Sequence, residues 1–200
     1  MMPIRFHPST GSIEVVCGCM FAGKTEELIR RLRRALYAKL SVKVFKPVID
    51  NRYDATNLVS HEGLTLAAVP VKDVSEIVDQ SVDARVIGID EAQFFSEDLA
   101  LVAEALANRG KRVVVAGLDL DYRGHPFGPM PTLMALADSV HKITAVCTVC
   151  GAVATRTQRI VASEEQVLVG GQTVYQARCR EHWSPEPVFS RQDQTGEMDG

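Results

Sequence analysis

Short runs of apolar, mostly β-branched residues alternate along this chain with segments in which apolar residues recur every three or four positions. The β-branched runs are typical of buried strands, which we expect at residues 13–17, 42–46, 66–69, 85–90 and 112–118. The recurring pattern predicts helices at residues 25–38 and 97–108, the first with leucines at positions 28, 32 and 36. Strands that alternate with helices favour a mostly parallel sheet with helices on both faces, so we expect an α/β fold.

The alternation stops near residue 146, where short strands, glycines and cysteines take over. We therefore predict a main α/β domain at residues 1–146, a small second module at residues 147–183 and a disordered, polar tail at residues 184–200. Residues 47–63 are polar and unpatterned, which indicates a loop that is either functional or mobile.

Composition and charge narrow the class of protein. The chain has 200 residues, 46% of them hydrophobic, which is enough for one sizeable core but not for a second large domain. The net charge is -3, and the arginines at positions 30, 31, 33 and 34 are more typical of a solvated helix face than of a nucleic-acid groove, so we expect no nucleic-acid partner. No apolar run reaches the ~18 residues that span a bilayer, and residues 1–10 lack the apolar segment of a secretory signal. We expect a cytoplasmic protein with no membrane partner.

Residues 18–25, GCMFAGKT, match a phosphate-binding loop, in which a glycine and four variable residues precede Gly23, Lys24 and Thr25. Glycines let the backbone approach phosphates closely, and the N–H groups of the loop and the following helix offer partial positive charge. Lys24 would bridge the β- and γ-phosphates of a nucleotide, and the Thr25 hydroxyl would bind Mg²⁺. A strand before the loop and a helix after it supply the required context, although an ordinary glycine-rich turn stays an alternative.

Two adjacent acids, Asp90 and Glu91, end the apolar run of the segment RVIGIDEAQFF. They fall at the carboxyl end of an expected central strand, which is where ligands bind in open α/β sheets. Asp90 suits a role at Mg²⁺, and Glu91 is then free to accept the proton of an attacking hydroxyl. A plain N-cap role in the next helix remains the alternative for Glu91.

Residues 117–128, GLDLDYRGHPFG, follow the next strand and combine glycines with aromatic side chains. Tyr122 and Phe127 are suited to stacking on a flat ring or enclosing it. Taken alone, two such aromatics are equally consistent with an ordinary core. Their position beside the carboxylate strand favours a ligand pocket.

Four residues near the end of the chain have the paired spacing of a structural zinc site: Cys147, Cys150, Cys179 and His182. Four protein ligands leave no open position on the metal, so we interpret the site as a clamp for a module that lacks a large core of its own. A redox dithiol or unpaired cysteines are the alternatives. Cys17, which stands apart from this group, is expected to be a small buried thiol.

Taken in order, the segments GCMFAGKT, DEAQFF, GLDLDYRGHPFG, CTVC, VGGQTVY and CREH resemble the cellular-type (type II) thymidine kinase family over residues 11–183. The resemblance implies a phosphate-loop NTPase-like, mostly parallel sheet flanked by helices, with a small zinc-binding lasso domain. It also implies transfer of the γ-phosphate of ATP to the 5′-hydroxyl of thymidine with Mg²⁺, in a homotetramer with one structural zinc per chain.

The resemblance assigns roles to residues of this sequence. Glu91 would be the general base, and Arg159 falls in a segment that matches one near the phosphates. The residues that bind ATP and its metal would be Gly18, Cys19, Met20, Phe21, Ala22, Gly23, Lys24, Thr25, Asp50, Arg52, Asp90 and Gln93. The lasso closes over the nucleoside in this family, and the residues around the thymine ring would be Met20, Leu118, Tyr122, Phe127, Thr157, Leu168, Val169, Gly170 and Tyr175.

Three positions depart from the family pattern. Cys19 stands where the family usually has proline, Ala22 where serine is common, and His182 where cysteine is frequent. None of these changes removes the lysine of the loop, and imidazole is an acceptable zinc ligand.

Two other functions compete with this interpretation. One is a nucleotide-switched binding module in which the zinc domain grips a partner and ATP hydrolysis resets it. The other is a kinase that acts on a different deoxynucleoside or on a small metabolite. Incubation with Mg-ATP and a panel of nucleosides separates all three.

Overall fold

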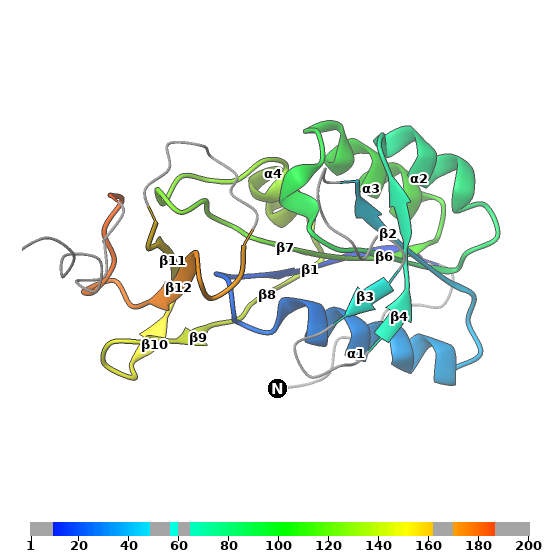
Figure 1. Ribbon diagram of the computed structural model, residues 1–200. Helices are drawn as coiled ribbons and strands as arrows, with labels where there is room; N and C mark the ends of the chain where they lie inside the picture. Colours follow the sequence, from blue (N-terminus) through cyan, green and yellow to red (C-terminus); the bar gives the residue numbers. More distant parts are fainter. Residues whose placement is uncertain (1–9, 49–56, 60–64, 162–169, 187–200) are drawn as a thin grey trace, which may run out of the picture.

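A computed structural model describes residues 10–48, 57–59, 65–161 and 170–186 of the chain, and the statements below concern those residues (Figure 1). Their main element is a six-stranded sheet in which all neighbouring strands are parallel. In spatial order the strands are β5 (Val69–Val71), β2 (Val42–Pro47), β6 (Val86–Ile89), β7 (Arg112–Gly117), β1 (Ser12–Cys17) and β8 (Ser139–Lys142). The prediction of a mostly parallel α/β sheet is confirmed.

Helices cover both faces of this sheet, as parallel strands require (Figure 1). Helix α1 (Lys24–Tyr37) lies on one face. On the other face lie α2 (Val74–Gln80), α3 (Asp98–Asn108) and α4 (Met130–Leu136). A short 3₁₀ turn, η1 (Ala92–Phe94), follows β6. None of the helices in the described ranges combines the length and the apolar character that crossing a bilayer requires.

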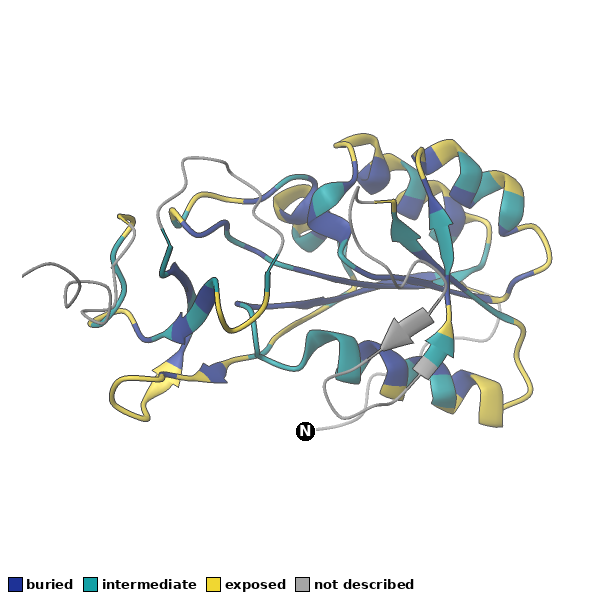
Figure 2. Ribbon diagram, in the orientation of Figure 1, coloured by how far each residue is buried: buried dark blue, intermediate teal, exposed yellow. Residues whose placement is uncertain are grey.

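The central strands are buried on both faces (Figure 2). Val15 of β1 packs into the cluster under α3, and Val16 packs with Leu28 and Leu32 of α1. Leu36, the third leucine of the repeat that predicted α1, is 43% exposed, whereas Leu28 and Leu32 are buried. Because residues four apart advance by ~40° around a helix, the third leucine has rotated away from the sheet.

Three two-stranded sheets accompany the main one. Near the carboxyl ends of β1 and β7, β9 (Ala145–Val146) pairs with β10 (Val153–Ala154), and β11 (Arg156–Arg159) pairs with β12 (Tyr175–Arg178) (Figure 1). The third sheet joins β3 (Asn57–Val59) to β4 (Thr65–Ala67). The single strand expected at residues 66–69 is wrong, because the chain leaves β4 at Ala67 and joins the main sheet as β5 from Val69.

Glu14 is a buried acid within β1, with 5% of its surface exposed. Its carboxylate binds Arg31 of α1 at 2.9 Å and Arg112 of β7 at 2.6 Å. The solvated arginine face expected on α1 is therefore correct for Arg30 and Arg34, which are exposed, but wrong for Arg31. A carboxylate buried in a strand needs such partners, because an unpaired charge there would be costly.

Candidate functional site

The predicted phosphate loop connects the end of β1 to the start of α1. Gly18 begins it with φ +143°, and a Cβ at this position would lie 2.2 Å from the carbonyl oxygen of Ile143, so a larger residue does not fit. Lys24 Nζ donates to the carbonyl oxygen of Cys19 at 2.8 Å and so curls over the loop. Burial lowers the pKa of Lys24, and the charge of Glu91 is the strongest influence that raises it. The lysine and the acid therefore lie within electrostatic reach of each other.

Thr25 and Asp90 connect the loop directly to the carboxyl end of β6. The Thr25 hydroxyl donates to Asp90 Oδ2 at 3.1 Å, and Asp90 is 6% exposed. Burial, followed by the charge of Glu91, raises the pKa of Asp90 above its usual range. Mg²⁺ prefers oxygen ligands such as hydroxyls and carboxylates. A cation beside the buried carboxylate of Asp90 would stabilise its charged form, so Thr25 and Asp90 fit the metal expected here.

Glu91 directly precedes η1 and has the left-handed conformation, with φ 51° and ψ 38°. This backbone region costs a non-glycine residue ~1–2 kcal/mol, and such strain concentrates at functional sites. The Glu91 side chain makes no capping hydrogen bond, so the N-cap alternative is not supported. Instead Glu91 Oε2 accepts a hydrogen bond from Gln93 Nε2 at 2.6 Å, and Gln93 Oε1 accepts one from the backbone N–H of Leu118 at 2.9 Å.

The segment after β7 forms a compact loop around Asp121. Its Oδ1 accepts hydrogen bonds from the backbone N–H groups of Arg123 and His125, both at 2.9 Å. Tyr122 and Phe127 are 5% and 9% exposed, and the Phe127 ring packs edge-on against Phe94 with centroids 5.5 Å apart. Both aromatics are thus packed at the carboxyl end of the sheet, where the pocket was predicted.

Strands β11 and β12 bring further predicted residues to this place. Arg159 is completely buried, with its guanidinium 3.6 Å from the Tyr122 ring centroid, and its Nη2 donates to the Tyr175 hydroxyl at 2.8 Å. Thr157 precedes it on β11, and its Oγ1 accepts a hydrogen bond from the backbone N–H of Met20 at 3.1 Å. Arg159, assigned by resemblance to a segment near the phosphates, therefore packs among residues assigned to the thymine ring.

Five further predicted positions lie in segments of the chain that are only partly described. Gly170 is described and lies beside Val174, just before β12. The other four, Asp50, Arg52, Leu168 and Val169, fall outside the described residues.

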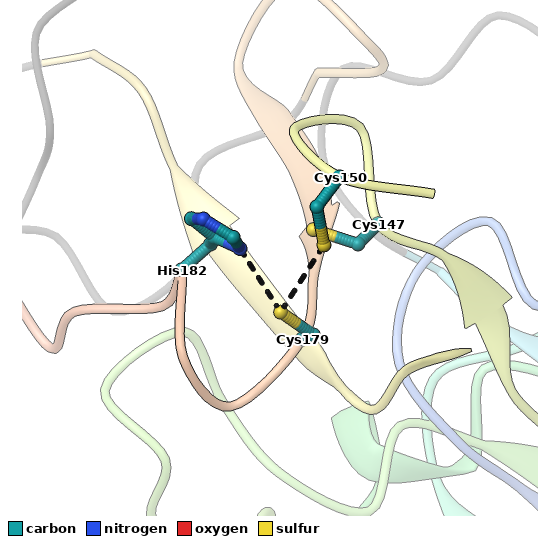
Figure 3. A group of neighbouring side chains, drawn as sticks. All are labelled: Cys147, Cys150, Cys179 and His182. Atoms are coloured by element: carbon teal, nitrogen blue, oxygen red, sulfur yellow. Dashed lines mark hydrogen bonds between the residues drawn. The ribbon is translucent and has the colours of Figure 1, made fainter. Parts of the chain in front are cut away.

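The four predicted zinc ligands lie together, with their donor atoms all within 4.8 Å of one another (Figure 3). Cys150 Sγ lies 3.8 Å from Cys179 Sγ, which lies 3.2 Å from His182 Nδ1. Zn–S bonds of about 2.3 Å place two sulfurs of a tetrahedral site about 3.8 Å apart, so the group fits Zn²⁺. Burial acts to raise the pKa of Cys147, but hydrogen bonds from backbone N–H groups, that of Cys179 foremost, lower it to about 6.

The predicted phosphate loop packs directly on the region of the predicted zinc ligands. Cys19 donates its thiol to the carbonyl oxygen of Ala154 at 3.4 Å. It belongs to one buried cluster with Cys147 and Cys179, against which Phe21 and Ala22 pack. Burial raises the pKa of Cys19, and it raises that of Cys17 to about 11, so both thiols stay protonated. Cys17 is a buried thiol, as expected.

Three residues at the site were not singled out from the sequence: Asp119, Lys142 and Trp183. Asp119 follows β7, is 5% exposed and pairs with Lys142 at the end of β8. Trp183 follows His182, and its indole N–H donates to the carbonyl oxygens of Tyr122 and Thr157. Two features of the sequence could have indicated them. Asp119 is a third acid just after a central strand, and Trp183 is a lone tryptophan next to a predicted zinc ligand.

Comparison with known proteins agrees with this arrangement. A family profile described as thymidine kinase matches residues 11–183. The thymidine kinase of Bdellovibrio bacteriovorus is 55% identical over 187 residues, covering 93% of this chain and 92% of that protein. The thymidine kinase of Coprothermobacter proteolyticus is 53% identical over 178 residues, covering 86% and 90%. Among solved structures, the flagellar accessory protein FlaH from Methanocaldococcus jannaschii is similar in fold, with a TM-score of 0.50 and 15% identity over 72% of this chain and 76% of that one.

Proposed function

The chain belongs to the thymidine kinase family, and from this premise we propose how its residues transfer the γ-phosphate of ATP to the 5′-hydroxyl of thymidine to give thymidine monophosphate. One observation carries the proposal. Thr25 of the phosphate loop is hydrogen-bonded to Asp90 at 3.1 Å, and Asp90 directly precedes Glu91. The residues proposed to bind ATP therefore lie next to the acid proposed to accept the proton of the nucleoside hydroxyl.

We propose that residues 18–25 hold the phosphates of ATP. In this structure Lys24 Nζ is bonded to a carbonyl of its own loop, and it would exchange that partner for the β- and γ-phosphate oxygens. Thr25 and Asp90 would hold Mg²⁺, which when bound supplies positive charge that neutralises the phosphates. The buried carboxylate of Asp90, whose pKa is raised by burial, supports this because a cation would compensate its charge.

We propose that Glu91 is the general base. The bond between the γ-phosphorus and the oxygen that bridges it to ADP breaks, the 5′-oxygen bonds to that phosphorus, and the hydroxyl proton passes to Glu91 and then to water. Because phosphoryl transfer has a loose transition state, alignment and charge neutralisation contribute more to the rate than removal of the proton. Gln93 would keep the acid in place through the hydrogen bond it donates.

The thymine ring would lie among residues from four parts of the chain. We propose that these are Met20 of the phosphate loop, Leu118, Tyr122 and Phe127 after β7, Thr157 of β11, and Leu168, Val169, Gly170 and Tyr175 of the lasso. The hydrogen bond between Met20 N and Thr157 Oγ1 supports the arrangement, since it joins the phosphate loop to strand β11 of the lasso.

We also propose the module boundary, assembly and location that the family resemblance implies. Residues 147–183 would form the lasso domain, whose structural zinc is held by the three cysteines and His182. The protein would be a cytoplasmic homotetramer, and light scattering coupled to size-exclusion chromatography tests the chain count.

One assay tests the function. The purified protein is incubated with Mg-ATP and a panel of nucleosides, and the nucleoside monophosphate and ADP are quantified. We expect thymidine monophosphate and ADP in equal amounts. ATP hydrolysis without any nucleoside phosphorylation would favour the nucleotide-switched binding module instead, and phosphorylation of another nucleoside alone would reassign the substrate.

A further inference from the structure

Trp183 is the only tryptophan of the chain, and it directly follows the predicted zinc ligand His182. It lies partly buried beyond β12, where the chain leaves the ligand group. Neither the phosphate loop nor the two acids that follow β6 require a tryptophan at this point. Its contacts therefore need an explanation of their own.

The indole N–H of Trp183 is shared between two backbone carbonyls. Nε1 donates to the oxygen of Tyr122 and to the oxygen of Thr157, both at 3.2 Å. Tyr122 belongs to the loop after β7, and Thr157 belongs to β11 of the zinc-bearing region. A single donor thus joins two segments that are distant in sequence and that the proposed function places around the thymine ring.

The indole ring is also fixed in position. A Cβ on Gly124 would lie 2.8 Å from Cη2 of Trp183, so the ring rests directly on the glycine backbone and a side chain there would displace it. On β11, the guanidinium of Arg156 lies 5.6 Å from the centre of the ring. Contact on the loop side and on the strand side leaves the indole little freedom to move.

Thr157 extends this connection to the ATP side. Its carbonyl accepts from Trp183, and its hydroxyl accepts from the backbone N–H of Met20 at 3.1 Å. A continuous path therefore runs from the zinc ligand His182 through Trp183 to Thr157 and on to the phosphate loop. A second branch of the path leads from Trp183 to Tyr122.

We propose that Trp183 is a positioning residue that fixes the separation of the two walls of the thymidine site, and that zinc binding by His182 and Cys179 fixes the indole. This inference rests on the proposed function only for the identity of the nucleoside. Trp183 acts through Tyr122 and Thr157.

The first test compares Trp183→Phe with the wild type as zinc-loaded, full-length protein. Phenylalanine keeps an aromatic ring over Gly124 but removes the donor. We expect the KM for thymidine to rise about fivefold to twentyfold, as for loss of one buried hydrogen bond, with an unchanged KM for ATP and unchanged zinc content. The matched control is Thr148→Val, which removes a hydroxyl bonded within the zinc region to Gln176 at 3.3 Å and should leave both KM values unchanged.

Three results would overturn the proposal: a thymidine KM within twofold of wild type, an equal rise in the KM for ATP, or loss of zinc from the variant. The last two would show general structural damage. If the wild type phosphorylates another nucleoside, the proposed function fails, but the same comparison is made with that substrate.

The second test needs no substitution, because the single indole reports its own surroundings. We expect its emission to change when thymidine binds to the zinc-loaded protein and to shift to the red when zinc is removed by a chelator, as the indole becomes exposed to water. Emission that is unaffected by zinc removal would refute the coupling to the metal. Emission that does not respond to thymidine would refute the coupling between Trp183 and the nucleoside site.

Discussion

Gln93 holds Glu91 in place and at the same time joins the ends of two neighbouring strands. Its Nε2 donates to Glu91 Oε2 at 2.6 Å, while its Oε1 accepts from the backbone N–H of Leu118 at 2.9 Å. Gln93 is 2% exposed, so neither bond competes with much water. Glu91 has a left-handed backbone conformation, which sets the direction of its side chain. The hydrogen bond from the Gln93 side-chain amide then holds the carboxylate in that position.

Replacement of Glu91 by glutamine should reduce kcat by about 10²- to 10⁴-fold, the usual contribution of a general base. ATP binding should be nearly unchanged, because the phosphate loop and Asp90 are intact. Steady-state kinetics and calorimetric titration with ATP measure the two quantities. Glu104→Gln, on the exposed face of α3, is the control for loss of a carboxylate and should keep full activity. Wild-type turnover in Glu91→Gln would remove the acid from the mechanism.

Replacement of Gln93 by leucine should reduce kcat by about tenfold, because Glu91 loses a donor and the Leu118 N–H loses its acceptor. A double-mutant cycle tests whether Gln93 acts through Glu91. If it does, the double variant should be no slower than Glu91→Gln alone. Losses that multiply in the double variant would mean that Gln93 contributes independently of the acid.

The long, strongly patterned elements of the fold were predictable from the sequence. The strands at residues 13–17, 42–46 and 112–118 and the helices at 25–38 and 97–108 correspond to β1, β2, β7, α1 and α3 with small shifts at their ends. Helices α2 and α4 were not identified, since each has 7 residues, too few to show a periodic pattern. The pairing of Glu14 with Arg31 depends on contact between a strand and a helix, which local sequence does not encode.

The site was predictable as motifs but not as contacts. The sequence singled out the predicted phosphate loop, the two acids and the group of three cysteines and one histidine, because each chemistry requires particular residue types at short spacing. It did not show that Cys19 bonds to Ala154 or that Trp183 bonds to Tyr122, since these partners are distant in sequence. Such contacts arise only when the carboxyl ends of the main-sheet strands come together with strands β10 to β12.

Thiol reactivity should separate the five cysteines into two groups. In zinc-loaded protein we expect little fast reaction with Ellman's reagent, because three thiols would bind metal and the other two are buried with raised pKa values. After chelation, Cys147, Cys150 and Cys179 should react quickly, whereas Cys17 and Cys19 should react only on unfolding. Mass spectrometry of the labelled protein identifies the modified positions. Labelling of Cys19 as fast as that of Cys150 would contradict the packing of the phosphate loop described above.

Stability in acid should depend on Glu27, in the first turn of α1. Its carboxylate accepts hydrogen bonds from Arg30 Nε at 2.6 Å and from Arg31 Nε at 2.8 Å, and the Arg30 bond foremost lowers the pKa of Glu27 from 4.5 to about 2. A carboxyl whose pKa is lower in the folded state stabilises the protein above its unfolded pKa, and this stabilisation is lost as the pH falls through the folded pKa.

Glu27→Gln should therefore reduce the free energy of unfolding by about 1 kcal/mol at pH 7, a value discounted for solvent screening of a partly exposed ion pair. The difference from wild type should shrink between about pH 5 and pH 2, as wild-type Glu27 is protonated. Denaturant unfolding at several pH values measures the difference, with Glu26→Gln in the same turn as the control for charge. A difference that stays constant down to pH 2 would show that the glutamate stabilises the helix by packing rather than by charge.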